Sequence, residues 1–319
     1  MLRVNGLHHI TAIAGPAQEN LDFYAGILGM RLVKRTVNQD DPTTYHLFYA
    51  DAEGHPGSDL TFFPWSQMAP ARYGYGLAVE TSLEVPAGSL AYWSARLQHY
   101  GVKLGEIDVR FGDRNLPLTD GHGFRLTLVE SARPPQRLFT PWRHSPVPPN
   151  HQIRGLYAAR LWEQNAERTS MFLTKVLGLI PAGAENGWAR YGSGSIAGCV
   201  DIRQAPEERR GVWGIGTVHH LAWRVQDEEQ QLAMRDQLER SGSRITNVID
   251  RFWFKSVYFR EPGGVLFEIA TDGPGFSKDE APEHLGEQLI LPPWLESQRD
   301  QIEHVLPPLT LPSPSTPHG

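Results

Sequence analysis

The hydrophobic pattern of the chain repeats one plan four times: a strand, a helix and then further strands. In the first segment, residues 7–13 are typical of a strand, and β-rich runs follow at 31–37, 44–49 and 60–63. Between them, apolar side chains recur at i, i+3, i+4 and i+7, which predicts a helix that ends at Gly29. These side chains are Leu21, Tyr24, Ala25 and Leu28.

Three more segments follow the same order, and each predicted helix again precedes a glycine. They begin with strands at 77–85, near 155 and from 218, and they end with strands at 124–129, 199–202 and 267–271. The helices are marked by Leu90, Trp93 and Leu97 before Gly101, by Phe172, Leu173, Val176 and Leu177 before Gly178, and by Leu232 and Leu238 before Gly242, with Asp227 as an N-cap. We therefore predict an α+β fold of four βαβββ modules.

Prolines divide the chain into two halves. Residues 134–152 contain Pro134-Pro135, Pro141 and the run 146–149, and we interpret them as a linker. The N-terminal half is then 1–133 and the C-terminal half 153–275, each with two modules. Residues 276–319 form a C-terminal extension, whose end from Pro307 is rich in Pro, Ser and Thr and is expected to be mobile or to lie over the surface.

Composition favours a cytoplasmic enzyme. The chain has 319 residues, is 40% hydrophobic and carries a net charge of −6 without a dense stripe of Lys and Arg, so we expect no nucleic-acid partner. The single Cys199 excludes an internal disulfide framework. The N-terminus lacks the apolar core of a signal peptide, and no run is long enough to span a membrane. No Gly-rich phosphate loop follows a strand, and the Gly-Ser run at 192–195 is interpreted as a polar turn rather than a nucleophile elbow.

The chemistry of the chain is concentrated in two His-His pairs. His8-His9 begins the first module and His219-His220 begins the fourth, while Glu268 lies on the last strand of the fourth. Two histidines and one carboxylate form a facial site for a redox-active divalent metal. Histidines on strands can also be merely hydrogen-bonded, but the repetition favours a metal site. Because neighbouring strand residues point to opposite faces, one histidine of each pair is expected to reach a given site.

At several motifs the chain resembles the vicinal oxygen chelate superfamily, which includes glyoxalases, bleomycin-resistance proteins and extradiol dioxygenases. The resemblance covers about residues 5–275. The strings at 7–11, 20–24, 250–251, 255–264 and 267–268 are similar to those of the dioxygenases that cleave para-hydroquinone rings. The resemblance implies two barrel-like sheets, each made of two paired modules.

The same resemblance implies the roles of individual residues. It assigns the metal ligands to His9, His220 and Glu268 and a substrate contact to His8, whereas His219 is expected to be structural. It also assigns Arg251 and Tyr258 to the substrate pocket, Arg251 to hold an anionic oxygen and Tyr258 to hydrogen-bond near the metal. Without the motif, Arg251 could be a surface ion pair and Tyr258 a packed aromatic. The neighbouring aromatics Phe252, Trp253 and Phe254 could line a pocket, but the sequence favours a packing role.

Equivalent positions in the other modules predict how the modules pair. Aligning the last strands on Glu268 places Thr61 and Thr127 where the first two modules would carry a carboxylate, and Asp201 in the third. The first strands of modules two and three have no histidine, so a second complete site cannot be assembled, and Asp201 is expected to be a surface or hydrogen-bonded carboxylate. His9 can join His220 and Glu268 only if modules one and four share a site.

Three functions stay open on the sequence alone. The first is a ring-cleaving dioxygenase that uses Fe(II) and O2 on a hydroquinone-like substrate, with Mn(II), Zn or Ni as other metals. The second is a glyoxalase-type isomerase or lyase, which loses ground because Thr61 leaves the usual fourth ligand position unfilled. The third is a non-catalytic protein that binds an aromatic or a quinone and needs no metal. The expected partners are a small aromatic substrate and O2, and no membrane association is expected. The sequence leaves open whether the protein forms a homo-oligomer.

Overall fold

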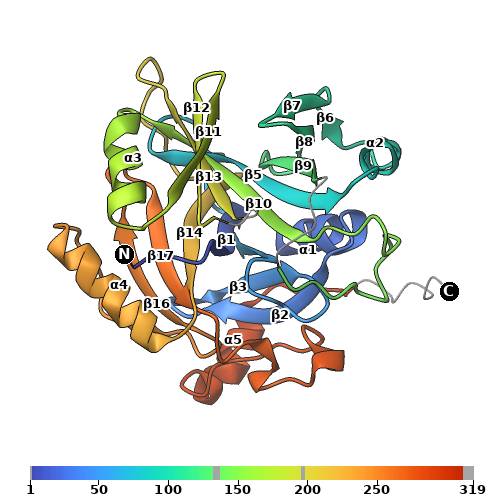
Figure 1. Cartoon of the computed structure of the whole chain (residues 1–319). Coiled ribbons are helices and arrows are strands. Elements are labelled where there is room, and N and C mark those ends of the chain that lie inside the picture. Colours follow the sequence, from blue (N-terminus) through green and yellow to red (C-terminus); the bar gives the residue numbers. More distant parts are fainter. Residues whose placement is uncertain (1, 132–136, 195–197, 312–319) are drawn as a thin grey trace.

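Two curled β-sheets and the helices around them make up the fold (Figure 1). The computed structural model describes residues 2–131, 137–194 and 198–311. The predicted linker residues Pro134 and Pro135, the last residue of the turn at 192–195 and the tail from residue 312 lie outside the described residues.

The first sheet combines the first and fourth modules. Its strands are β1 (Leu7–Ala14), β2 (Arg31–Asn38), β3 (Asp41–Ala50), β4 (Asp59–Pro64), β14 (Thr217–Val225), β15 (Ile249–Asp250), β16 (Lys255–Arg260) and β17 (Leu266–Thr271). Their spatial order is β15-β16-β17-β14-β1-β4-β3-β2, with β1 and β14 antiparallel at the centre. All eight residues of β1 are buried, as expected for a central strand that is covered on both faces. The first and the last module thus meet in one sheet.

The second sheet combines the second and third modules. Its strands are β5 (Leu77–Pro86), β6 (Lys103–Leu104), β7 (Asp108–Arg110), β8 (Asp113–Thr119), β9 (Arg125–Ser131), β10 (Gly155–Glu163), β11 (Ile180–Glu185), β12 (Trp188–Gly192) and β13 (Cys199–Gln204). The order is β11-β12-β13-β10-β5-β9-β8-β6, and β7 pairs with β8. The predicted α+β fold of paired modules is confirmed, and each sheet takes one module from each half of the sequence.

Each module contributes one helical segment. They are α1 (Ala17–Leu21), which continues as the π-helix η1 (Asp22–Ile27), α2 (Leu90–His99), α3 (Ala166–Lys175) and α4 (Glu228–Arg240). In Figure 1, α3 and α4 lie on one side of the molecule and α1 and α2 on the other. The predicted N-cap is confirmed, because the Asp227 side chain accepts a hydrogen bond from the backbone N–H of Gln230 at 2.9 Å. Gly178, after α3, has φ +71° and lies so close to Leu2 that a Cβ would meet its carbonyl oxygen at 2.6 Å.

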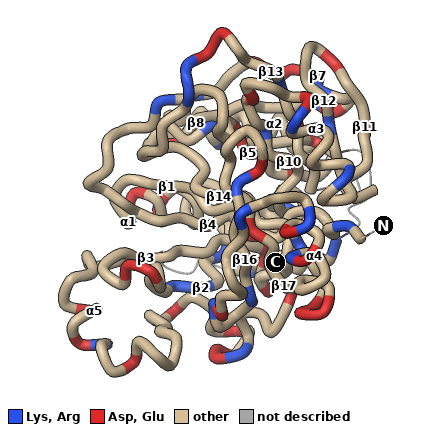
Figure 2. Tube along the Cα trace, turned by 90° about the vertical axis from the view of Figure 1, so that its left-hand side faces the viewer, with Lys and Arg blue, Asp and Glu red and all other residues tan. Residues whose placement is uncertain are grey.

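The C-terminal extension packs beside β2 and β3 (Figure 2). It contains η2 (Phe276–Lys278), η3 (Pro282–His284), η4 (Glu296–Gln298) and α5 (Arg299–Val305). Leu289 forms a β-bridge with Arg35, and the Tyr45 hydroxyl donates to the carbonyl oxygen of Pro307 at 2.9 Å. The described part of the extension is therefore attached to the first sheet.

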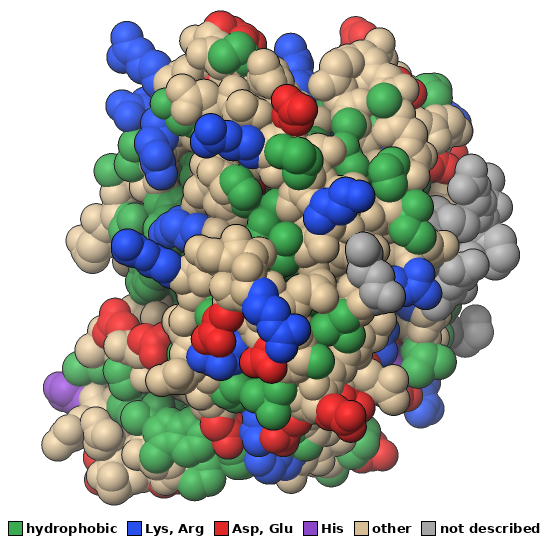
Figure 3. Space-filling model, turned by 60° about the vertical axis from the view of Figure 1, so that its left-hand side comes forward, with side chains coloured by type: hydrophobic (Ala, Val, Ile, Leu, Met, Phe, Trp, Pro, Cys, Tyr) green, Lys and Arg blue, Asp and Glu red, His purple; other side chains and the backbone are tan. Residues whose placement is uncertain are grey.

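Charged residues of both signs are distributed over the chain. Segments of both signs are scattered along the trace in Figure 2, and on the face in Figure 3 both signs are mixed with hydrophobic side chains. Among the helices of the described residues, none combines the length and the apolar character that crossing a membrane requires.

Candidate metal centre and substrate cavity

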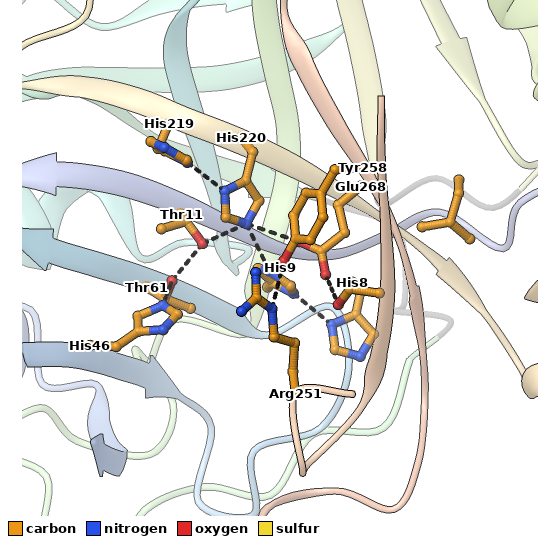
Figure 4. Close-up of polar contacts among 12 residues, drawn as sticks. His8, His9, Thr11, His46, Thr61, His219, His220, Arg251, Tyr258 and Glu268 are labelled. Atoms are coloured by element: carbon orange, nitrogen blue, oxygen red, sulfur yellow. Dashed lines mark hydrogen bonds and ion pairs between the residues drawn. The ribbon is translucent and has the colours of Figure 1, made fainter. Parts of the chain in front are cut away.

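The side chains of His9, His220 and Glu268 converge at the centre of the first sheet (Figure 4). The Nε2 atoms of the two histidines lie 3.2 Å apart. Oε2 of Glu268 lies 3.3 Å from Nε2 of His9 and 3.0 Å from Nε2 of His220. All three residues are buried. The structure therefore brings together the three residues that the sequence predicted as ligands.

Strand register explains this convergence. Ala222 on β14 is the register partner of His9 on β1 and of Glu268 on β17. His220 precedes Ala222 by two positions on the same strand, so its side chain emerges on the same face. Three adjacent strands thus each supply one donor atom.

The geometry and protonation of this group fit a divalent metal. Donors at right angles around an ion with bonds of about 2.1 Å lie about 3.0 Å apart, close to the separations here. Burial lowers the pKa of His220, which keeps its imidazole neutral and able to bind. Burial alone would raise the pKa of Glu268, but His9 and His220 beside it bring the pKa well below its usual value. The Ser256 hydroxyl donates to the other oxygen, Oε1, and leaves Oε2 to the site.

A β-bulge lies at the first histidine of each pair. In the β1–β14 ladder, the register shifts between Leu7 and His9, so His8 is the extra residue on β1, and a second shift leaves His219 as the extra residue on β14. The Nδ1 atoms of His8 and His9 lie 2.9 Å apart, and those of His219 and His220 lie 2.8 Å apart. Each first histidine therefore contacts the ring nitrogen of its neighbour that faces away from the site.

The expectation of one histidine from each pair holds for the candidate ligands, which include His9 and His220. At the cavity, strand alternation does not hold, because the bulge interrupts the two-residue period and His219 lines the cavity beside His220. His219 stacks on Trp213, with ring centroids 4.6 Å apart.

His8 faces a different cavity from the one that His9 lines. It borders a smaller space of about 210 Å³ together with Asp59 and Phe254. Its Nε2 has no hydrogen-bond partner among the described residues, and burial lowers the pKa of its imidazole to about 3. The predicted contact between His8 and substrate has no direct counterpart in this placement and stays a prediction.

The larger cavity opens beside the three candidate ligands and has a volume of about 450 Å³. Aromatic rings make up much of its wall, with Arg251 and Tyr258 on one side, and the aromatic residues that line it are Phe48, Phe63, Trp65, Trp253, Phe254 and Tyr258. The predicted packing role of Trp253 and Phe254 is confirmed, because both are buried in a hydrophobic cluster, and both also border the cavity. Its size and apolar character suit a small flat ring.

Arg251 and Tyr258 form one polar group in this wall. Nε of Arg251 donates to the Tyr258 hydroxyl at 3.3 Å, and its Nη atoms contact Asp40 at 2.8 and 3.1 Å. Burial disfavours the charge on Arg251, but Tyr258 and Asp40 outweigh it and raise its pKa, so the guanidinium stays cationic. Burial, followed by the charge of Glu268, raises the pKa of Tyr258, so its hydroxyl keeps its proton.

The sequence did not reveal a hydrogen-bonded chain from His46 to His220 of the candidate metal centre. Nε2 of His46 lies 2.8 Å from Oγ1 of Thr61, which lies 2.8 Å from Oγ1 of Thr11, and that hydroxyl lies 3.0 Å from Nε2 of His220 (Figure 4). Thr61 thus fills the expected fourth ligand position with a hydroxyl. Burial lowers the pKa of His46 well below its usual value. The one sequence feature that could have indicated this chain is a histidine, His46, within the predicted strand 44–49.

The second sheet repeats the register of the candidate metal centre with other residues. Arg160 on β10 pairs with Glu80 on β5 and with Asp201 on β13, as Ala222 pairs with His9 and Glu268. Glu80 and Asp201 therefore occupy the places of one histidine and of the glutamate.

Arginines fill the space where the second sheet would hold a metal. Arg190 donates to both oxygens of Asp201, at 2.7 and 2.9 Å, and Arg110 donates to Glu80 at 2.6 Å. Asp201 is buried, so it is the hydrogen-bonded carboxylate rather than the surface one of the two expected alternatives. Within the described ranges, the three predicted ligands are the one group of His, Cys, Asp and Glu donors close enough to share an ion.

Paired βαβββ modules around a His, His and Glu site are the arrangement expected for the vicinal oxygen chelate fold. Residues 6–130 and 156–269 match the family described as the Glyoxalase/Bleomycin resistance protein/Dioxygenase superfamily. The chain belongs to this superfamily.

Similar proteins cover nearly the whole chain. It is 44% identical over 304 residues to the "Putative ring-cleaving dioxygenase MhqO" of Bacillus subtilis (strain 168), covering 95% of this chain and 96% of that protein. It is 35% identical over 312 residues to the "Chlorohydroquinone/hydroquinone 1,2-dioxygenase" of Sphingobium indicum, covering 94% and 95%. A crystal structure of a "putative dioxygenase" from Bacillus subtilis superposes with a TM-score of 0.92 at 42% identity, covering 98% of this chain and 100% of that one.

Proposed function

We propose that this protein is a non-haem Fe(II) dioxygenase of the extradiol type that cleaves the ring of hydroquinone-like aromatic diols with O2. The observation that carries the proposal is the meeting of His9, His220 and Glu268 beside a cavity walled by aromatic rings. Three protein donors on one side of an ion leave coordination positions on the other side. The names of the relatives support the same class of reaction.

His9, His220 and Glu268 would hold the metal through Nε2, Nε2 and Oε2. When bound there, Fe(II) supplies open coordination positions for a substrate oxygen and O2 and the redox chemistry that links them. The Nδ1 contacts from His8 and His219 would hold the rings of His9 and His220 in one orientation, and with Nδ1 of His9 and of His220 as the donors, each Nε2 would carry no proton and could bind the metal. We therefore include His8 in the site through its contact with His9.

Arg251 and Tyr258 would orient the substrate. The aromatic walls bind a flat ring and exclude water from the site. The cationic Arg251 attracts an anionic oxygen, and the protonated Tyr258 hydroxyl can donate a hydrogen bond to an oxygen near Glu268. In this arrangement one ring oxygen would lie at the candidate ligands and the other would be held by Arg251 or Tyr258. The two oxygens of a para-hydroquinone can fill both places, whereas the adjacent oxygens of a catechol cannot.

Thr61 supports the dioxygenase over the isomerase. Its hydroxyl is hydrogen-bonded to Thr11 and lies within hydrogen-bond distance of His46, and no carboxylate stands there as a fourth ligand. A three-donor set leaves more room for two small ligands than a four-donor set does.

The test is oxygen uptake by protein that has been loaded anaerobically with Fe(II). We expect consumption of O2 in proportion to added hydroquinone, formation of a ring-opened product and slower turnover of catechol. A His220→Ala variant treated in the same way is the matched control. Efficient catechol cleavage without hydroquinone activity would reject the substrate, and no oxygen uptake with either diol by metal-loaded protein would reject the dioxygenase.

A further inference from the structure

The loop formed by residues 250–254 builds one wall of the substrate cavity. Arg251, Trp253 and Phe254 line the 450 Å³ cavity, and Trp253 and Phe254 also line the 210 Å³ cavity beside His8. The Phe254 ring lies 5.2 Å from the ring of His9. The conformation of this loop therefore decides the shape of the space next to the candidate ligands.

The loop has a backbone conformation that its sequence does not favour. Phe252 has φ +74°, in the left-handed region that bulky residues rarely adopt. Such a conformation persists where surrounding contacts hold it. Within the loop, the Asp250 side chain accepts from the backbone N–H of Phe252 at 2.7 Å, and the N–H of Arg251 donates to the carbonyl of Phe254 at 2.9 Å.

The start of the C-terminal extension supplies further contacts to this loop. Nζ of Lys278 donates to the carbonyl oxygen of Phe252 at 3.1 Å and lies 3.8 Å from the centre of its ring. The backbone N–H of Gly275, just before the extension, donates to the carbonyl oxygen of Trp253 at 2.8 Å. Both contacts satisfy backbone carbonyls of the loop itself.

Asp279 attaches the loop through the side chain of Trp253. Its two carboxylate oxygens accept from the indole Nε1 of Trp253 at 3.0 and 3.1 Å. Nζ of Lys34 donates to the same carboxylate at 2.7 Å, contacts Glu280 and lies 5.2 Å from the Trp253 ring. The Lys34 side chain is 0% exposed, so Asp279 joins a buried cation of β2 to the cavity wall.

The loop has a further attachment, on its solvent-exposed side, that is weaker than the one through Asp279. Arg251 pairs there with Asp40, whose side chain is 71% exposed, whereas that of Asp279 is 17% exposed. Solvent screens the first pair more than the second. Asp279 therefore holds the loop more firmly than Asp40 does.

We propose that Asp279 is a positioning residue for the substrate cavity. By holding Trp253 against Lys34, it keeps the 250–254 loop in the conformation that directs Arg251 and Phe254 into the cavity. This gives the C-terminal extension a part in substrate selection although none of its described residues, 276–311, lines the larger cavity. The inference rests on the proposed function for the identity of the substrate, but the order of the loop can be measured without turnover.

The direct test is hydrogen–deuterium exchange of the 250–254 backbone amides. We expect exchange in Asp279→Ala to be about tenfold faster than in the wild type, because the charged hydrogen bonds that link Asp279 to Trp253 and Lys34 are lost. Asp279→Asn retains one oxygen acceptor and should restore most of the protection. Glu287→Gln is the matched control, since this acid lies in the same extension and pairs with His284 instead of the loop. If Asp279→Ala fails to fold, Lys278→Met tests the attachment while Lys34 keeps its partners.

Steady-state kinetics then separate positioning from stability. In Asp279→Ala we expect KM for hydroquinone to rise about tenfold, with kcat changed less than about twofold and metal content unchanged, because the competent loop conformation is populated less. Unchanged exchange in both Asp279→Ala and Lys278→Met would overturn the inference, as would a wild-type KM in a variant with faster exchange. If the wild type cleaves neither diol but Asp279→Ala still exchanges faster, the proposed function is rejected and the attachment of the loop by Asp279 is supported.

Discussion

Nε2 of His9 and Nε2 of His220 lie 3.2 Å apart, although 211 positions separate them in the sequence. The antiparallel pairing of β1 and β14 brings them together, so the site forms only when the first and last modules have joined in one sheet. The chemistry proposed here therefore depends on long-range folding and cannot belong to either half of the chain alone.

Replacing any of the three candidate ligands should remove the metal. In His9→Ala, His220→Ala and Glu268→Ala, we expect metal affinity to fall by more than about 100-fold, since loss of an indirect partner alone costs about 10–100-fold. Metal content after dialysis, measured by elemental analysis, tests this. Glu239→Gln, a surface change on α4, is the control. Full metal occupancy in all three alanine variants would contradict the assignment.

Replacing the two residues proposed to orient the substrate should spare the metal. We expect Arg251→Ala and Tyr258→Phe to retain the metal while kcat/KM for hydroquinone falls by about 10²–10⁴-fold, because substrate position and proton handling are disturbed. Anaerobic loading followed by oxygen-uptake kinetics measures both quantities. Loss of metal together with activity would instead show that these side chains support the ligands.

His219 offers a test of ligand orientation. His219→Phe can keep the stacking on Trp213 but loses the Nδ1 contact with His220. We expect metal affinity to fall by about 10–100-fold. A titration with a competing chelator measures this, and Trp213→Phe, which leaves the nitrogen contact in place, is the comparison. Equal affinity in His219→Phe and the wild type would mean that the bulge alone orients His220.

A buried acid pair should make stability depend on pH. Both oxygens of Glu163 lack a hydrogen-bond partner among the described residues, and burial, followed by the charge of Glu261, raises its pKa from 4.5 to about 9. The unfolded chain loses this proton near pH 4.5 and the folded chain near 9, so the contribution of Glu163 to stability declines as the pH rises between these values, by at most ~1.4 kcal/mol per pH unit.

Thermal unfolding from pH 5 to 9 measures this effect. Glu163→Gln keeps a neutral side chain of the same shape, so its Tm should change less with pH than that of the wild type. Glu239→Gln, which neutralises an exposed acid on α4 and leaves Glu163 and Glu261 in place, should keep the wild-type slope. Parallel pH profiles for the wild type and Glu163→Gln would show that Glu163 is ionised in the folded protein.

Local sequence patterns determined the modules and their helix ends. Gly29, Gly101, Gly178 and Gly242, where the helices were predicted to end, all have positive φ in the structure. These ends could be predicted because glycine suits that conformation and the apolar period before it marks the helix. The missing histidines of modules two and three likewise predicted that modules one and four share a site, and the sheet order confirms this pairing. These features could be predicted because each depends on residues that are close in sequence or on equivalent positions of a repeat.

Tertiary structure alone decided which additional side chains reach the site. The bulges that bring His219 to the cavity arise from pairing across two distant strands, and a two-residue period does not reveal them. His46 joins through Thr61 on a neighbouring strand, and Asp279 reaches Trp253 from an extension in which the sequence showed no motif. The sequence by itself determined the four modules and the residues that can bind a metal, whereas strand register and packing between distant segments decided the walls and supports of the cavity, because those contacts exist only after the sheets have closed.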